Sequence, residues 1–392
     1  MTGGVAGTAA GLPADLADLH LLVGSYTATG GGNATGISAV HGSTASTVAV
    51  MDDPSFLALS GARVYAVSET ADGSVSAFRY AGGSFEHRWD ADAGGDAPCH
   101  VRVDPSGALV VTNYVSGTVT AVSLEAAESH AASVSASDGV VGAHGTGDRV
   151  VVPEAAIVTG VLPDVEGPVE DRQEGPHAHQ SIATPDGTVL VADLGGDALH
   201  EFRVSAEPTI DLVRVHHLAP GVGPRHMAWL GTGAGAERGA GAAADLGAGT
   251  GADLVVAGEL DGRVYRLRRD ESGTLRPIAS APAFEGAVGE SLLSHVEVDQ
   301  AGRVVVAVRG RDLIVVLDTA DDGLTVVGSA SCGGVWPRHF AQVPGYLLVA
   351  NQMSDAIAVL PVGKDGMPGE AVAQIAVGSP ACIVPVPEGV RS

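Results

Sequence analysis

The sequence predicts an all-β protein, a seven-bladed β-propeller, and three observations lead to this fold class. Short runs rich in Val, Leu, Ala and Ile are bounded by Gly, Asp, Pro and Ser, which is typical of strands joined by tight turns. Glycine makes up 55 of the 392 residues, which indicates many turns. Similar segments recur about every 44 residues, the spacing expected of propeller blades.

Three segments show the repeat most clearly, and each predicts a strand, a tight turn, a strand, a polar turn and a third strand. They read HVRVDPSGALVVTNYVSGTVTAVSL, QSIATPDGTVLVADLGGDALHEFRV and HVEVDQAGRVVVAVRGRDLIVVLD. We find no convincing long helix; the Ala-rich stretch near 124–135 is the nearest candidate.

Two positions recur in every repeat. The first slot begins the strand predicted to lie nearest the axis, and its members are Ser55, Cys99, His179, Arg225, Ser294, Arg338 and Ala381. The second slot comes one residue past the end of the next strand, and its members are Tyr26, Glu69, Tyr114, Leu194, Glu259, Arg309 and Gln352. Antiparallel strands joined by a tight turn have their free ends together. Both slots therefore lie on one face of the disc, around its central opening.

The two series are offset at the ends of the chain. Tyr26 has no first-slot strand before it, and Ala381 has no second-slot strand after it. We therefore expect the strand near 381–386 to pair with the N-terminal strands near 20–26 and 36–41. This pairing closes the ring and removes its open sheet edges.

The domain organisation follows from the same alignment. A single propeller domain is predicted over 19–388, preceded by a flexible segment at 1–18. Two repeat intervals are long because they contain insertions. One insertion lies between 125 and 175, and the other is the Gly/Ala-rich loop 231–252.

Charge and composition exclude several classes of partner. The formal net charge of −25 argues against nucleic acid and anionic membranes, which require clustered Lys and Arg. Three distant cysteines imply neither a disulfide framework nor a zinc cage. The N-terminus does not resemble a signal peptide, and no apolar run approaches 18 residues. We expect a soluble cytoplasmic protein, a monomer or a weak homo-oligomer.

The two slots carry an unusual set of polar residues on the pocket face. His179, Arg225 and Arg338 stand where other blades have small residues, and Glu259 and Arg309 join them from the second slot. The mouths of closed β architectures are common ligand sites. Arginines, a histidine and a carboxylate together predict a pocket for an anion with acid–base capacity.

The stretch EGPHAHQ leaves alternatives open for its two histidines. The spacing of His177 and His179 puts both on one face of a strand, as a metal site would require. His100, His226 and His339 follow first-slot residues, so we expect them to face away from the pocket and to have a structural role. Without a third ligand we expect no metal. His179 is then either an acid–base or substrate-binding residue or a polar strand end.

Several motifs in order resemble one family. They are PCHVRVDPSG, GPHAHQSIATPDG, VGPRHMAWL, VAGELDGRVYRL, VAVRGRD and GGVWPRHFAQVPGYLLVANQMSDAIAVL. Together, over residues 20 to 386, they resemble the lactonase family of seven-bladed β-propellers, which includes 6-phosphogluconolactonases and carboxy-muconate lactonizing enzymes. The resemblance implies that His179 is the acid–base histidine and Glu259 the blade-end glutamate. It also implies that Arg225 and Arg309 bind the anion and that Arg338 matches a recurring arginine.

The leading functional hypothesis is hydrolysis of a small anionic sugar lactone, with 6-phosphogluconolactone as the first candidate. His179 and Glu259 are the candidate catalytic residues. The candidate substrate-binding residues are Arg225, Arg309, Arg338, Glu69, His177 and Tyr114. No cofactor is implied. The alternatives are lactonization of a carboxy-muconate and a non-catalytic propeller that binds a ligand or a protein.

Overall fold

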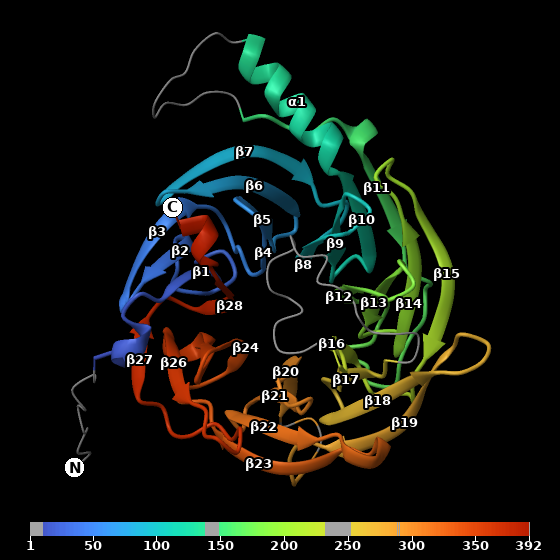
Figure 1. Cartoon of the computed structure of the whole chain (residues 1–392). Helices are drawn as coiled ribbons and strands as arrows, with labels where there is room; N and C mark the ends of the chain where they lie inside the picture. The colour runs from blue at the N-terminus through green and yellow to red at the C-terminus, as the bar shows by residue number, and fades with distance from the viewer. Residues whose placement is uncertain (1–10, 138–148, 232–251, 288, 290, 392) are drawn as a thin grey trace.

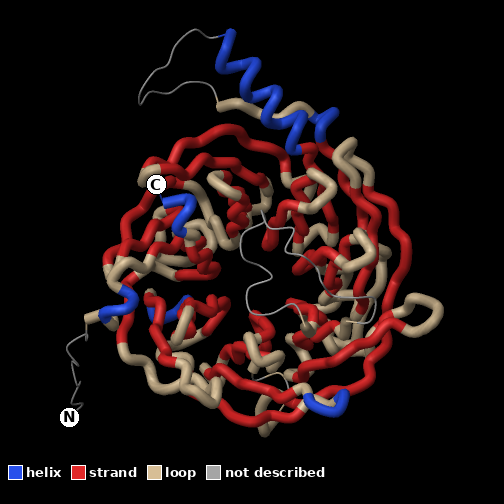
Figure 2. Tube along the Cα trace, in the orientation of Figure 1, coloured by secondary structure: helices blue, strands red, loops and turns tan. Residues whose placement is uncertain are grey.

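The computed structural model describes residues 11–137, 149–231, 252–287, 289 and 291–391. Its strands form seven four-stranded antiparallel sheets, arranged as blades around a central axis (Figure 1). The prediction of a seven-bladed β-propeller is therefore confirmed. Strands make up most of the disc, and the longest helix lies outside it (Figure 2). The Gly/Ala-rich loop predicted at 231–252 lies almost entirely outside the described residues.

Each blade runs from an innermost strand to an outer one (Figure 1). The innermost strands are β28 (Pro380–Pro385), β4 (Leu57–Ser60), β8 (Pro98–Val103), β12 (Ala178–Ala183), β16 (Pro224–Trp229), β20 (Leu292–Val298) and β24 (Pro337–Val343). The second strands are β1 (His20–Ser25), β5 (Arg63–Ser68), β9 (Ala108–Asn113), β13 (Val189–Asp193), β17 (Leu254–Gly258), β21 (Val304–Arg309) and β25 (Tyr346–Asn351).

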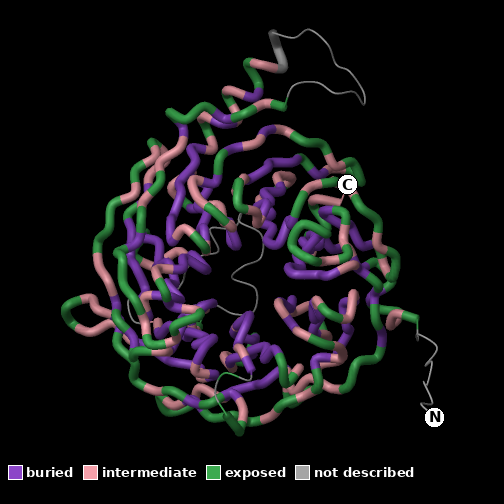
Figure 3. Tube along the Cα trace, turned by 180° about the vertical axis from the view of Figure 1, so that it is seen from behind, coloured by how far each residue is buried: buried purple, intermediate pink, exposed green. Residues whose placement is uncertain are grey.

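In the outer half of each blade the third strand is still largely buried, whereas the outermost strand faces solvent. The third strands are β2 (Gly36–His41), β6 (Ser74–Ala81), β10 (Thr118–Ser123), β14 (Ala198–Val204), β18 (Arg263–Arg269), β22 (Leu313–Asp318) and β26 (Ala356–Pro361). The outermost strands are β3 (Thr44–Val50), β7 (Ser84–Asp92), β11 (Ile157–Val161), β15 (Ile210–His217), β19 (Leu275–Pro282), β23 (Thr325–Ser331) and β27 (Ala373–Ala376). Burial decreases from the inner to the outer strands (Figure 3).

The ring is closed by one blade built from both ends of the chain. β28 pairs antiparallel with β1, with Leu21 opposite Pro385 and Gly24 opposite Cys382. β1 then pairs with β2, and β2 with β3. The predicted closure is thus confirmed, and neither β1 nor β28 is left as an open edge.

The hydrophobic core lies between neighbouring blades rather than at the centre of the disc. Val305 and Ile314 of the sixth blade, for example, pack with the fully buried Phe340 and with Val349 of the seventh. Aliphatic β-branched residues dominate because each blade face is a pleated surface that must be filled. Burial of each such side chain contributes roughly 1.5–3 kcal/mol. This packing leaves the axis lined largely by polar side chains.

Two helical features go beyond the sequence expectation. The Ala-rich stretch is a regular helix, α1 (Leu124–Ser137), which lies outside the blades (Figure 1). Short helices complete the chain: η1 (Ala14–Leu16), η2 (Glu154–Ala156), η3 (Ala320–Asp322), η4 (Gln352–Ser354) and α2 (Glu388–Arg391). Within the segment 1–18 that we predict to be flexible, η1 places Leu16 in a buried apolar cluster.

Candidate active site

A bulge at the start of the inner strands shapes the central channel. The register shifts at Pro98/His100, Ala178/Ser181, Pro224/Met227, Leu293/Val296 and Pro337/His339. In a bulge, two residues of one strand oppose a single residue of its partner. In each of these five inner strands, the first-slot residue and the one after it can therefore both face the axis.

This geometry corrects our expectation for the histidines that follow the first slot. We expected these histidines to face away from the pocket. Instead they line the channel, each directly after a first-slot residue. The ring of Phe56, in the second blade, lies 6.4 Å from that of His226 in the fifth and 5.9 Å from that of His339 in the seventh. Simple alternation of side chains along a strand fails here because the bulge interrupts it.

Glu259 stands at the centre of an arginine cluster at the mouth of the channel. It follows β17, and its side chain is almost fully buried. Its Oε1 accepts a hydrogen bond from Arg172 Nη2 at 2.6 Å, and its Oε2 lies 2.7 Å from Arg309 Nη2 and 3.0 Å from Arg225 Nε. Burial alone raises the pKa of Glu259, but the three guanidinium groups outweigh it and lower the pKa to about 2.

Arg225 and Arg309 carry hydrogen-bond donors that the described chain does not use. Arg225 Nε and Nη1 and Arg309 Nε are buried without a hydrogen-bond partner among the described residues. The contact between Arg225 Nε and Glu259 is an ion pair too bent for a hydrogen bond. Burial, followed by repulsion from Arg309, lowers the pKa of Arg225 to about 9. Buried donors left without acceptors are costly, so these atoms favour a bound anion.

Arg338 is held on the opposite side of the cluster by Tyr26. Its Nη2 donates to the Tyr26 hydroxyl, and its Cζ lies 4.8 Å from the centre of the Tyr26 ring. Tyr26 in turn donates to Glu69 Oε2 at 2.8 Å. Burial raises the pKa of Glu69. Both carboxylates of the pocket are thus engaged with the chain's own donors.

His179 lies close enough to the arginines of this cluster for their charges to lower its pKa. Its side chain is buried, and its Nδ1 has no hydrogen-bond partner among the described residues. Burial and then the charges of Arg225, Arg338 and Arg309 hold the pKa of His179 well below its usual value. The imidazole is therefore neutral at pH 7 and has a lone pair available as a proton acceptor.

The remaining predicted residues form the wall beside His179. Tyr114 stacks on His177, with ring centres 4.4 Å apart, and meets the ring of His179 edge-on at 5.8 Å. His177 Nδ1 donates to the Tyr114 carbonyl at 2.9 Å, and its Nε2 lies 3.2 Å from Glu174. Because both ring nitrogens of His177 are engaged, its geometry suits a residue that positions Tyr114.

Arg172 is the residue of this site that the sequence reasoning missed. It lies in the insertion before the fourth blade, where no repeat position exists to flag it. The available signal was its place five residues before the HAH motif, in a short Asp- and Glu-rich turn. With it, the pocket holds four arginines and two carboxylates: Arg172, Arg225, Arg309, Arg338, Glu69 and Glu259. At least two positive charges are uncompensated, in a chain whose net charge is −25.

Comparison with known proteins places this fold and pocket in a family. The family model described as lactonase, seven-bladed beta-propeller, matches residues 20–385. The chain belongs to this lactonase family. The resemblance inferred from its motifs is thereby confirmed.

Individual relatives agree with this membership. A 6-phosphogluconolactonase from Bacillus subtilis is 30% identical over 280 residues, which cover 69% of this chain and 68% of the relative. A 6-phosphogluconolactonase from Formosa agariphila is 26% identical over 330 residues, covering 78% and 80% of the two chains. The solved structure of a periplasmic gluconolactonase from Pseudomonas aeruginosa shares the fold with a TM-score of 0.70, at 23% identity, and covers 94% of this chain and 99% of that one.

Across the described ranges, no three His, Cys, Asp or Glu side chains converge as metal ligands. The expectation that no metal or cofactor is needed stays a prediction. In the same part of the chain, no helix is both long and apolar enough to cross a lipid bilayer.

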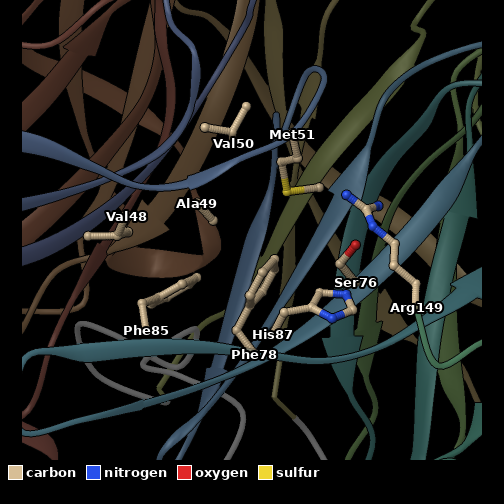
Figure 4. A pocket seen from close by; sticks show the side chains of 9 residues that line it. All are labelled: Val48, Ala49, Val50, Met51, Ser76, Phe78, Phe85, His87 and Arg149. Atoms are coloured by element: carbon tan, nitrogen blue, oxygen red, sulfur yellow. The ribbon is translucent and has the colours of Figure 1, made fainter. Parts of the chain in front are cut away.

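A second hollow lies on the outside of the disc, away from the channel. It has a volume of about 310 Å³ and is lined by residues 48–51 and the side chains of Ser76, Phe78, Phe85, His87 and Arg149 (Figure 4). None of these residues belongs to either slot. The lining is largely apolar, so the chemistry of the molecule is concentrated in the channel.

Proposed function

We propose that this protein hydrolyses a small anionic sugar lactone, with 6-phosphogluconolactone as the substrate to test first. The observation that carries the proposal is the set of buried, unpartnered guanidinium donors on Arg225 and Arg309 beside a neutral His179. Membership of the lactonase family and the names of the two relatives above support the reaction class. The excess positive charge of the pocket suits a substrate with a phosphate group.

In the proposed mechanism, His179 is the general base. Glu259 is a poor candidate for that role, because three arginines occupy both of its oxygens and lower its pKa to about 2. A bound anion offsets the arginine charges and raises the pKa of His179 towards its ordinary value. His179 then accepts a proton from a water molecule as the water oxygen attacks the lactone carbonyl.

The arginines stabilise the charge that this attack creates. The free nitrogens of Arg225 and Arg309 can donate to the carbonyl oxygen as it becomes an oxyanion, and such preorganised donors give the largest catalytic effect in acyl transfer. When the intermediate collapses, the bond from the carbonyl carbon to the ring oxygen breaks. Protonated His179 returns its proton to that oxygen, which leaves as the sugar hydroxyl, and the new carboxyl group loses its proton to solvent. Glu259 holds the arginines in place throughout.

The decisive experiment is hydrolysis of freshly made 6-phosphogluconolactone near pH 6.5, comparing wild type with His179→Ala. We expect kcat to fall by about 10²–10⁴-fold in this variant, the usual contribution of general acid–base catalysis. His217→Ala, which removes an exposed histidine at the end of β15, is the matched control. Turnover that survives His179→Ala would reduce His179 to a polar strand end. A wild type that turns over a carboxy-muconate instead would favour lactonization.

The cellular setting belongs to the same proposal. We infer a cytoplasmic protein that is a monomer or a weak homo-oligomer. We also infer that neither nucleic acid nor membrane is a partner, because the net charge is −25. Cell fractionation tests the location, and light scattering of the purified protein tests the oligomeric state. A membrane-bound fraction or a stable oligomer would contradict these inferences.

A further inference from the structure

Arg172 differs from the other arginines of the pocket in its origin and its exposure. The other three come from slot positions of the blades, whereas Arg172 comes from the connection between β11 and β12. Its side chain is 33% exposed, compared with 5% for Arg225 and 6% for Arg309. Arg172 therefore lies at the rim, between the buried cluster and solvent.

The turn that carries Arg172 is held firmly against the fourth blade. The backbone N–H groups of Arg172 and Gln173 both donate to the Val169 carbonyl, at 2.9 and 2.8 Å. Gln173 is fully buried; its Nε2 donates to the Leu194 carbonyl at 2.9 Å, and its Oε1 accepts from the Val169 N–H at 3.2 Å. Leu194 is itself a second-slot residue. The guanidinium of Arg172 is thus presented to the pocket by a fixed support.

Arg172 is paired with a hydroxyl that has a proton to give. Its Nη2 donates to the Tyr114 hydroxyl at 3.3 Å as well as to Glu259 Oε1. Burial raises the pKa of Tyr114, which keeps the phenol neutral. The Tyr114 oxygen accepts from Arg172, so its proton remains available for an acceptor in the pocket. A guanidinium and a phenol side by side suit the oxygens of a phosphate.

A phosphorylated sugar lactone needs two anion-binding centres, because its carbonyl and its phosphoryl group lie at opposite ends of the sugar. His179, Arg225 and Arg309 form the buried centre, where the carbonyl reacts. We propose that Arg172 and Tyr114 form the second centre, which binds the phosphoryl group and makes the enzyme prefer phosphorylated lactones. This inference rests on the proposed lactonase function. It assigns specificity to an insertion that is not part of the blade repeat.

The test compares two substrates, 6-phosphogluconolactone and glucono-1,5-lactone, in wild type, Arg172→Gln and Arg172→Lys. In Arg172→Gln we expect kcat/KM for the phosphorylated lactone to fall roughly 10- to 150-fold, mainly through KM, because a charged hydrogen bond is lost. The value for the unphosphorylated lactone falls by a smaller factor, so the preference drops at least tenfold. Arg172→Lys restores part of the preference because it keeps the charge without the planar fork.

Arg276→Gln is the matched control, because Arg276 forms a 2.6 Å pair with Asp270 on the exposed surface. It should leave the preference for the phosphorylated lactone as in wild type. Equal losses for both substrates in Arg172→Gln would overturn the inference, because Arg172 would then act only by holding Glu259. No loss for either substrate would overturn it too.

Failure of the proposed function can be recognised separately. If wild type hydrolyses neither lactone, calorimetric titration with inorganic phosphate tests Arg172 alone. A phosphate affinity at least tenfold weaker in Arg172→Gln than in wild type and Arg276→Gln would still support the rim anion site. Equal affinities in all three proteins would overturn it.

Discussion

The pocket layer and the layer below it use neighbouring residues of the same strands in opposite ways. The pocket layer consists of the two slots and Arg172. The histidine layer consists of the polar residues that follow first-slot positions, His100, Gln180, His226, His295 and His339; Phe56 and Cys382 occupy this position in the other two blades. The pocket layer has more donors than the described chain can satisfy. The histidine layer bonds to itself and to the next blade. Within one channel, the pocket layer is thus suited to bind a ligand, and the histidine layer is suited to hold neighbouring blades together.

The bonds of the histidine layer follow a pattern around the ring. His100 Nδ1 lies 3.4 Å from the backbone N–H of Ser181, and His339 Nδ1 lies 3.4 Å from that of Ile383, so each histidine contacts the next inner strand. Gln180 accepts from the backbone N–H of Met227 in the same way. These contacts fit the structural role that the recurrence of the histidines predicts.

His226 and His295 complete the layer through a direct contact between rings. Their Nδ1 atoms are 2.9 Å apart, and His295 Nε2 lies 3.1 Å from Glu297 Oε1. When His226 donates its Nδ1–H to His295 Nδ1, the Nε2–H of His295 can donate to Glu297 Oε1. Burial, and for His226 the neighbouring Arg225, holds the pKa of His226 and His339 well below the usual value. The arginine charge in the pocket layer thus helps to keep His226 and His339 uncharged.

The largest effect on catalysis is expected at Arg225, in the pocket layer. In Arg225→Met, kcat/KM for the lactone should fall about 10²–10³-fold, because a donor to the oxyanion is lost. The thermal midpoint should stay nearly constant, because an apolar side chain of similar length replaces a guanidinium with unpartnered nitrogens. Kinetics and calorimetry on one preparation check both. Normal turnover with a large loss of midpoint would make Arg225 structural.

The adjacent residue should give the reverse result. His226→Ala leaves a cavity and removes the partner of the buried His295 Nδ1. We expect the free energy of unfolding to drop by roughly 2–3 kcal/mol, while kcat of the folded protein stays within about threefold of wild type. Urea unfolding measures the first quantity. A loss of kcat as large as in Arg225→Met, with unchanged stability, would show that the two layers act as one site.

As the pH is lowered, the free energy of unfolding should fall first because of the buried histidines, and only at lower pH because of Glu259. The folded-state pKa of His226 and His339 lies below the unfolded value of about 6.5, so their contribution is complete above pH 6.5 and is lost as the pH falls below it. Below pH 6.5, each of these histidines lowers the free energy of unfolding by up to ~1.4 kcal/mol for every pH unit. Glu259 adds a further loss below about pH 4.5. Unfolding measured from pH 8 to 5 should show a shallower decline in His226→Ala; identical slopes would contradict this account.

Much of this arrangement could be predicted from the sequence because it repeats. The period gave the blade count, and the offset of Tyr26 and Ala381 predicted the closing blade. The slots brought the buried arginines and His179 together. The orientation of His226 was predicted wrongly, because the bulge at the start of β16 has no recognisable sequence signature. Arg172 was missed because an insertion has no equivalent in other blades to compare it with.

Helix α1 shows another limit of sequence patterns. Its residues are helix formers but have only a weak apolar stripe, so periodicity alone did not identify it convincingly. Contacts across the structure support it instead. Arg63 donates to both oxygens of Glu128, at 2.9 and 2.7 Å, and Trp89 Nε1 donates to Glu128 Oε1 at 3.2 Å. Those partners lie in the second blade and are not apparent from the local sequence.

The closing blade sets an order of events during synthesis. Among the described strands β1 is translated first, whereas its inner neighbour β28 is translated last. Until then, the nascent chain presents an open edge at β1 and lacks the final inner strand, which also carries Ala381 of the first slot. The channel can therefore acquire its complete wall only after β28 has been translated. A nascent chain that lacks β28 should not bind ligand in a fully closed channel.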